Sequence, residues 1–252
     1  MKLCFQSGYN RRSLFALSVV ILFGVAVSAT WSGLLLQNLA EVDWFLIATW
    51  VLMTALVCWD VRPGPDLTLA LVALAGGLSF EWWGTRTQLW WYFTSDQPPL
   101  WILPAWPMAA LASDRIARWL EAGGSARPAV WRVLYWVGLG AFTLAMIRFI
   151  WPSIAYPLSQ IAAIMILLIL SLGIAPKRDT CLFLGGSLLG IALEYWGTSR
   201  ACWTYYTHQT PPIVTILAHG FAQIGYARVL DLLTWGLRTS GAEPRTSRPP
   251  AS

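Results

Sequence analysis

The amino-acid sequence predicts an all-α membrane protein, a polytopic helical bundle of about eight transmembrane helices arranged as two parallel four-helix repeats. Of the 252 residues, 57% are hydrophobic and only 12% are charged, whereas soluble domains carry about 25% charged residues. The apolar runs are long and continuous, as in helices that satisfy their backbone hydrogen bonds within lipid. Two segments, one around Glu81 and one around Glu194, also share a motif. This composition excludes an ordinary soluble enzyme, a disordered chain and a basic nucleic-acid-binding domain.

Each predicted helix is an apolar run close to the roughly 20 residues that a helix needs to cross a bilayer. In chain order the runs are Ser13–Leu36, Asp43–Asp60, Leu67–Trp83, Leu100–Leu120, Ala129–Ile150, Ser153–Ile174, Thr180–Trp196 and Ile213–Leu237. They divide into a first repeat, residues 1–124, and a second repeat, residues 125–237. Residues 238–252, rich in Ser, Pro, Arg and Gly, are predicted to form a disordered cytoplasmic tail.

The first apolar run has a second interpretation. Arg11 and Arg12 precede it, and Val27-Ser28-Ala29 resembles a signal-peptidase site. We favour a retained helix because the run continues to Leu36, and cleavage stays an alternative.

Basic residues predict the orientation. With the N-terminus inside, the outer side holds only three of the 17 Lys and Arg residues, namely Arg86, Arg148 and Arg200. Cytoplasmic loops carry the excess of positive charge. We therefore expect a multi-pass protein of the cell inner membrane, with both termini cytoplasmic and the motif loops extracytoplasmic.

The internal repeat aligns without a gap. Glu81-Trp82-Trp83-Gly84-Thr85 matches Glu194-Tyr195-Trp196-Gly197-Thr198, and the match continues at Trp90 with Trp203, Tyr92 with Tyr205 and Pro98-Pro99 with Pro211-Pro212. Four predicted spans separate equivalent elements, so both copies have the same orientation, which indicates a parallel repeat about an axis along the membrane normal. We expect the two glutamate segments to meet at one outer mouth.

Glu81 and Glu194 are the candidate catalytic residues. A carboxylate near hydrocarbon is costly and usually faces a cavity or a partner, and a protonated carboxylic acid in an apolar pocket is a general acid. The structural alternative is that each glutamate only holds its own loop, through Thr85 or Thr198 or by pairing with Arg86 or Arg200.

Aromatic and basic residues at fixed positions relative to the glutamates are the candidate substrate-binding set. Aromatic faces stabilise cations, although an interfacial aromatic belt would give a similar composition. The set is Trp83, Trp90, Tyr92, Trp196, Trp203, Tyr205, Arg86, Arg200 and His219. His219 lies within a predicted span, where an ionisable residue suggests function, and a histidine bonded to a neighbouring carbonyl is the alternative.

No metal or cofactor is expected. The sequence has no H-E-x-x-H, P-loop, G-x-S-x-G or D-D-x-x-D segment. Its four cysteines, Cys4, Cys58, Cys181 and Cys202, lack C-x-x-C spacing.

The string from Glu81 to Thr87, with Trp90, Tyr92, Pro98-Pro99 and Leu103-Pro104-Ala105-Trp106, resembles membrane carotenoid-biosynthesis proteins of the bisanhydrobacterioruberin hydratase type. The resemblance covers roughly residues 77 to 107, and again residues 190 to 219. Gln88-Leu89-Trp90-Trp91 stands where that pattern has a Gly-Pro-Phe-Gly character. The resemblance implies hydration or cyclisation of an isoprenoid double bond without metal or redox cofactor, with Glu81 as the matched acid and Glu194 as its repeat equivalent.

Three functions follow as hypotheses. The first is an integral membrane enzyme that performs acid-initiated hydration or cyclisation of an isoprenoid or carotenoid-like lipid. The second is a non-enzymatic binder or transporter of a lipid or small amphiphile, and the third is a structural membrane subunit. All three place the partner in the membrane and none involves nucleic acid.

Overall fold

The computed structural model describes residues 8–240, without the side chains of Glu41 and residues 235–240. Cys4 and residues 241–252 of the predicted tail lie outside this range. Within it the all-α prediction is confirmed. The elements are α1 (Arg11–Thr30), α2 (Ser32–Gln37), a 3-10 turn (Leu39–Glu41), α3 (Trp44–Cys58), α4 (Pro63–Arg86), β1 (Trp90–Tyr92), a 3-10 turn (Leu100–Ile102), α5 (Ala105–Gly123), α6 (Pro128–Ile150), a 3-10 turn (Trp151–Ser153), α7 (Pro157–Ser171), α8 (Pro176–Ser199), β2 (Trp203–Tyr205) and α9 (Ile213–Ser240).

Several boundaries differ from the prediction. Helices α4 and α8 begin four residues early, at Pro63 and Pro176, because proline is favoured in the first turn of a helix. Both continue past the glutamates, so Glu81 and Glu194 lie inside helices. The first predicted span is divided into α1 and α2, and α9 continues through the start of the predicted tail to Ser240.

Five described helices, α1, α4, α6, α8 and α9, are long and apolar enough to cross a membrane by length and composition. Helices α3 and α7 are apolar but have only 15 residues each, about 22 Å at 1.5 Å per residue. Large hydrophobic side chains stay exposed on the outer helices, among them Leu22, Leu36, Val137, Leu144 and Ile164. Contiguous apolar surface of this kind marks a face that meets lipid or protein, and the chain has the features of a membrane protein.

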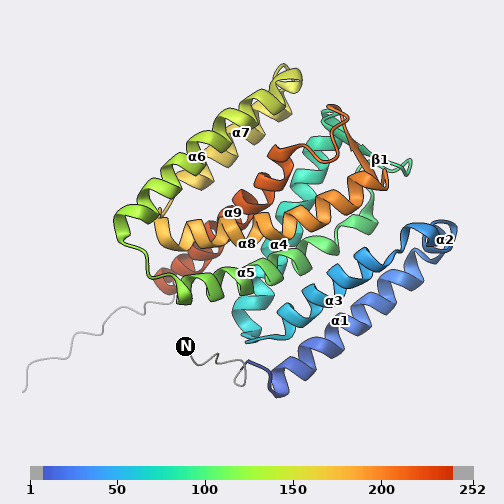
Figure 1. Cartoon of the computed structure of the whole chain (residues 1–252), viewed down its shortest axis with the longest axis horizontal. Helices are drawn as coiled ribbons and strands as arrows, with labels where there is room; N and C mark the ends of the chain where they lie inside the picture. Colours follow the sequence, from blue (N-terminus) through green and yellow to red (C-terminus); the bar gives the residue numbers. More distant parts are fainter. Residues whose placement is uncertain (1–7, 241–252) are drawn as a thin grey trace, which may run out of the picture.

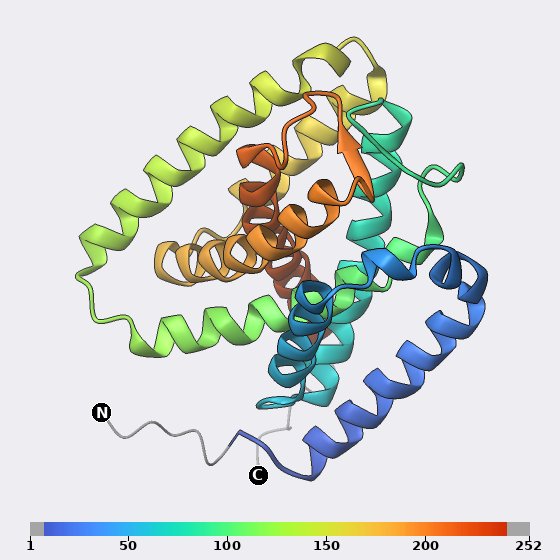
Figure 2. The same ribbon diagram turned by 45° about the vertical axis from the view of Figure 1, so that its right-hand side comes forward.

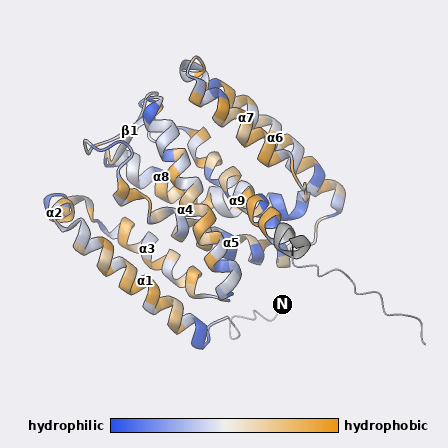
Figure 3. Cartoon of the chain, turned by 180° about the vertical axis from the view of Figure 1, so that it is seen from behind, coloured by the Kyte–Doolittle hydropathy of each residue, from blue (hydrophilic) through white to orange (hydrophobic). Residues whose placement is uncertain are grey.

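Helices α4, α5, α8 and α9 form the centre, with α1 and α3 on one side and α6 and α7 on the other (Figures 1 and 2). Figure 3 shows the strongly apolar character of the outer helices. Glycines permit close approach at the centre. A Cβ added at Gly185 would lie 2.6 Å from a carbonyl of α5, and one at Gly186 would lie 2.6 Å from a carbonyl of α9.

Two buried ion pairs stand near the N-terminal ends of α4 and α8. Arg115 on α5 donates to Asp66, Asp114 and the Trp59 carbonyl. Arg228 on α9 pairs with Asp179. Each arginine is only 1% exposed, so these pairs tie α5 to α4 and α9 to α8 at the end of the bundle opposite the glutamates.

Candidate functional site

The same turn ends α4 and α8. Gln88 and Ala201, which occupy equivalent positions of the repeat, both adopt positive φ values, of 57° and 54°. The N–H of Leu89 donates to the carbonyl of Gly84, and the N–H of Cys202 donates to that of Gly197. This is the Schellman arrangement that closes a helix end. It turns each chain back, so that the following strand runs beside the last helical turns.

Strands β1 and β2 pair in an antiparallel sheet whose register is symmetric. Trp90 faces Tyr205, and Tyr92 faces Trp203. In each pair, the tryptophan of one repeat faces the tyrosine of the other repeat. The flanking hydrogen bonds repeat the pattern, since Phe93 N–H donates to the Cys202 carbonyl and Tyr206 N–H to the Leu89 carbonyl.

The carboxylate of Glu81, 4% exposed, accepts hydrogen bonds from three aromatic side chains. Trp90 Nε1–H and Tyr92 O–H donate to Oε2 over 3.0 and 2.7 Å, and Trp106 Nε1–H donates to Oε1 over 3.2 Å. Two of these donors come from β1 and the third from α5. Glu81 therefore reaches beyond its own loop to the next helix.

The carboxylate of Glu194, 5% exposed, has the equivalent surroundings with one difference. Trp203 Nε1–H donates to Oε2 over 3.2 Å, and Tyr205 O–H lies 2.9 Å from the same oxygen. The third partner is His219 on α9, whose Nε2 lies 3.0 Å from Oε1. Among the side chains that the structure describes, which end at residue 234, His219 is the one basic group bonded to either glutamate.

Glycines flanking each glutamate let the rings lie against the helix. A Cβ at Gly84 would lie 1.9 Å from the Trp90 ring, and one at Gly197 would lie 1.9 Å from the Trp203 ring. One turn before Glu81, a Cβ at Gly77 would lie 2.2 Å from the Trp106 ring. We call such a glycine and the ring over it a glycine platform.

The two glutamate clusters touch each other through their rings. The ring centroids of Trp90 and Tyr205 are 5.9 Å apart, and those of Tyr92 and Trp203 are 6.0 Å apart. Trp106 and His219, the helix-borne partners of the glutamates, stack at 5.7 Å with an interplanar angle of 17°. The structure thus brings together Glu81, Glu194 and five of the predicted binding residues, Trp90, Tyr92, Trp203, Tyr205 and His219.

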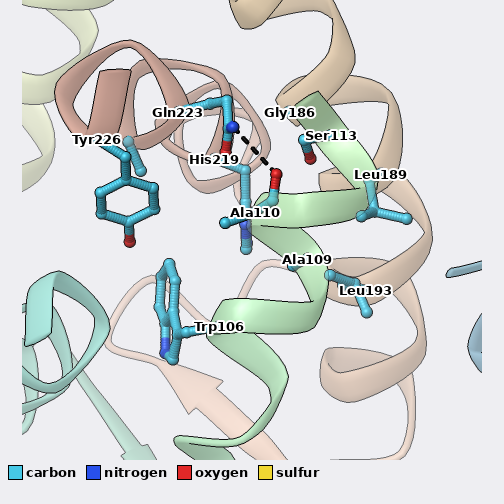
Figure 4. A pocket seen from close by; sticks show the side chains of 11 residues that line it. Trp106, Ala109, Ala110, Ser113, Gly186, Leu189, Leu193, His219, Gln223 and Tyr226 are labelled. Atoms are coloured by element: carbon cyan, nitrogen blue, oxygen red, sulfur yellow. Dashed lines mark hydrogen bonds between the residues drawn. The ribbon is translucent and has the colours of Figure 1, made fainter. Parts of the chain in front are cut away.

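A small cavity of about 10 Å³ lies beside this stack, between α5, α8 and α9. Figure 4 shows Trp106, His219, Gln223 and Tyr226 around it, with small residues of α5 and with Gly186, Leu189 and Leu193 of α8 on the other side. The buried hydroxyl of Tyr226 has no hydrogen-bond partner in the described structure. This volume is about that of one water molecule.

The other predicted binding residues lie elsewhere. Trp83 Nε1–H donates to Ser159 on α7, although its ring also meets Trp90 at 6.2 Å. Arg200 is bonded to Asp43 at the start of α3, and Arg86 is not a partner of Glu81 in the described structure. Trp196 contacts the Trp203 ring at 6.4 Å.

The threonines do not hold the glutamate side chains. Thr85 and Thr198 donate to the backbone carbonyls of Glu81 and Glu194, not to the carboxylates. The alternative in which Thr85 or Thr198 bonds the glutamate side chain is therefore wrong, and so is the alternative in which Arg200 pairs with Glu194.

Trp106 and Tyr226 are the site residues missing from the predicted set. Trp106 and His219 occupy equivalent positions of the two repeats, so applying the repeat spacing to His219 would have found Trp106. The repeat gives no reason to select Tyr226, because the equivalent residue of the first repeat is Ser113.

Burial, reinforced by the adjacent glutamates, raises the pKa of both Tyr92 and Tyr205 well above the ordinary value of 10.0. Both phenols therefore keep their protons at neutral pH and act as hydrogen-bond donors to the carboxylates.

The fold and site define a helical protein, with five helices able to cross a membrane, that holds a buried centre of two carboxylates and aromatic donors. Among residues 8–240, no group of three or more His, Cys, Asp and Glu side chains is placed to bind a metal ion. No family model, curated protein or solved structure matches the chain.

Proposed function

We propose that the chain is an eight-span membrane protein built from two parallel four-helix repeats, residues 1–124 and 125–237. Equal lengths support this: α3 and α7 have 15 residues each, α4 and α8 have 24 each, and both pairs start at equivalent positions of the repeat. The symmetric β1–β2 register is the pattern that a local two-fold axis produces. The short helices α3 and α7 count as spans, since thinning of the bilayer accommodates short helices.

We further propose that this protein is an integral membrane enzyme that starts the hydration or cyclisation of an isoprenoid or carotenoid-like lipid with a proton. One observation carries the proposal: two carboxylates are buried in an apolar bundle without a Lys or Arg partner, and their surroundings are N–H and O–H groups of aromatic rings and one imidazole. Ionisable groups at such a depth are costly and usually functional.

The chemistry fits the residues. The proton adds to one carbon of a double bond, and the π electrons form the new C–H bond. The cation left on the other carbon is stabilised by the faces of neighbouring rings. Water then adds to it in a hydratase, or a second double bond closes a ring in a cyclase, and one proton returns to the protein.

In the described conformation the cavity beside the glutamates admits water and not an isoprenoid. Sites for drug-sized ligands measure roughly 300–1,000 Å³, against about 10 Å³ here. The substrate therefore reaches the centre only when α5, α8 and α9 separate. At the cavity these helices meet through small residues such as Ala109, Ala110 and Gly186, together with Leu189 and Leu193.

For localisation we propose the cell inner membrane, with the glutamate clusters near the extracytoplasmic face. The ion pairs of Arg115 and Arg228 then lie near the cytoplasmic face. This orientation rests on the distribution of Lys and Arg.

The test compares lipid extracts of a deletion strain complemented with wild type, Glu81→Gln or Glu194→Gln, by liquid chromatography and mass spectrometry. We expect deletion to change the isoprenoid profile, and at least one Gln variant to fail to restore it while it accumulates in the membrane. Gln keeps the shape and loses the acid. Restoration by both variants would rule out acid catalysis by these groups.

A lipid transporter is the second candidate, and one observation favours it: the cavity lies between the two proposed repeats, where substrate sites of repeat-built transporters lie. Transport predicts an unchanged set of isoprenoids with an altered distribution between the two leaflets. The same extracts, combined with leaflet-selective labelling, separate the two candidates.

A further inference from the structure

The two glutamate clusters differ at one bonded position. Glu81 has Trp, Tyr and Trp as partners, and Glu194 has Trp, Tyr and His. An indole N–H only donates a hydrogen bond and does not titrate near neutral pH. An imidazole can donate, accept and carry a proton. His219 therefore adds to the second cluster a capacity that Trp106 does not give to the first.

The small cavity lies beside both of these helix-borne partners. His219 and Trp106 both line it, as do Tyr226 and Gln223 of α9. Gln223 is committed to the Ala110 carbonyl over 3.0 Å, as the dashed line in Figure 4 shows, whereas the Tyr226 hydroxyl is buried without a partner. A cavity of this size beside a buried, unsatisfied hydroxyl has room for one water molecule.

The repeat also places a glycine against each of these two side chains. A Cβ at Gly190 would lie 2.9 Å from His219, and a Cβ at Gly77 would lie 2.2 Å from the larger Trp106 ring. The glycines therefore let both side chains lie close against the neighbouring helix.

We propose that His219 is the group that carries the reacting proton, that Glu194 positions it and shares this proton with it, and that the adjacent cavity binds the reacting water. The assignment deepens the proposed function and rests on it where activity is concerned. The Glu81 cluster then serves as the structural partner, which holds β1 and stacks Trp106 on the imidazole.

The step balances with water as the co-reactant. The imidazolium N–H gives its proton to the alkene carbon, and the alkene π pair forms the C–H bond. A lone pair of the cavity water then bonds to the cation. The proton released from that water returns to His219, directly or through the Tyr226 hydroxyl. The net reaction adds one water to one double bond.

The first test does not depend on activity. The chain has two histidines, and the other one, His208, is exposed, so His208→Gln leaves a single imidazole for ¹⁵N NMR in nanodiscs at neutral pH. We expect the ring-nitrogen shifts of His219 to change when Glu194→Gln is added, because the partner that shares the proton is then lost. Identical ring shifts with and without that substitution would overturn the shared proton.

The second test uses the complemented deletion strain. His219→Trp copies the first cluster and keeps an N–H donor, and His219→Gln serves as a second variant if the tryptophan prevents folding. General acid–base groups contribute about 10²- to 10⁴-fold, so we expect either folded variant to lose product by about that factor, and His208→Gln to match wild type.

A loss below about tenfold in both folded variants would overturn the role of His219. It would leave the proposed function in place if Glu194→Gln still abolished product. A deletion strain with an unchanged isoprenoid profile would instead refute the proposed function, and the NMR result would still decide whether the proton is shared.

Discussion

Substitution of Gly84 by alanine tests the glycine platform directly. The added Cβ would stand 1.9 Å from Cη2 of Trp90, so the indole must move and give up its hydrogen bond to Glu81. Overpacking costs about 1–3 kcal/mol, and a hydrogen bond to a charged acceptor contributes about 1.5–3 kcal/mol. Replacing a helical glycine by alanine regains about 0.5–1 kcal/mol. The net loss of stability is therefore about 2–5 kcal/mol.

The matched control is Gly138→Ala on α6, where an added Cβ meets nothing within 4 Å. Thermal unfolding in detergent, followed by tryptophan fluorescence, measures both variants. At roughly 2–4 °C per kcal/mol for a chain of this size, Gly84→Ala should lower Tm by about 4–20 °C, and Gly138→Ala should leave Tm unchanged or slightly higher. If Gly84→Ala melts at or above the control, Trp90 does not lie on the helix as described.

Three other predictions follow from the same geometry. Because the pKa values of Tyr92 and Tyr205 are raised, the stability tied to their protonation is complete below pH 10.0 and is lost as the pH rises above it. As the pH is raised above 10.0, the melting temperature of the Tyr92→Phe/Tyr205→Phe double variant should therefore fall less than that of wild type. An equal fall in both proteins would contradict this. Arg228→Ala leaves the buried carboxylate of Asp179 without its arginine partner and should cost about 3–5 kcal/mol in the same unfolding assay, against no measurable change if the pair is solvated. In a background without native cysteines, a membrane-impermeant maleimide on intact cells should label Asp96→Cys and not Arg127→Cys, and the reverse pattern would invert the proposed orientation.

The repeat spacing predicts most of the site residues from the sequence alone. It aligned the glutamates with the tryptophan and tyrosine of each strand, and these are the donors that the structure places on the carboxylates. The spacing could do this because each turn and strand is local, within 11 residues of its glutamate. The third donor, 25 residues away on the next helix, depends on how α4 packs on α5 and α8 on α9.

Neither Arg86 nor Arg200 pairs with a glutamate in the described structure, and for Arg86 the reason is geometric. Arg86 follows Glu81 by five residues in one continuous helix, which places the two side chains about 140° apart around its axis. Only residues three or four apart share a helix face. Sequence proximity thus suggested a pairing that the helix forbids, and Arg200 instead bonds Asp43 from α3.

For the segments that form β1 and β2, the sequence predicts loops and no strand pairing. Three residues per strand carry too little alternation to be recognised, and Trp90, Trp91 and Tyr92 are as typical of an interfacial belt as of a strand. Exposure now separates the two roles. Trp82 is 50% exposed and Tyr195 is 53% exposed, as belt residues would be, while Tyr92 and Tyr205 are buried against the glutamates.

A structural and a catalytic role for the glutamates are compatible, and the difference between the clusters shows how. Each carboxylate satisfies the N–H and O–H groups that hold its strand, which is sufficient reason for a glutamate at both positions. That reason applies equally to both copies and so cannot explain a histidine in only one of them. Trp106 satisfies the equivalent carboxylate oxygen of Glu81 with an indole N–H. The property that histidine adds and tryptophan lacks is proton transfer, and His219 brings it to the wall of the small cavity between α5, α8 and α9.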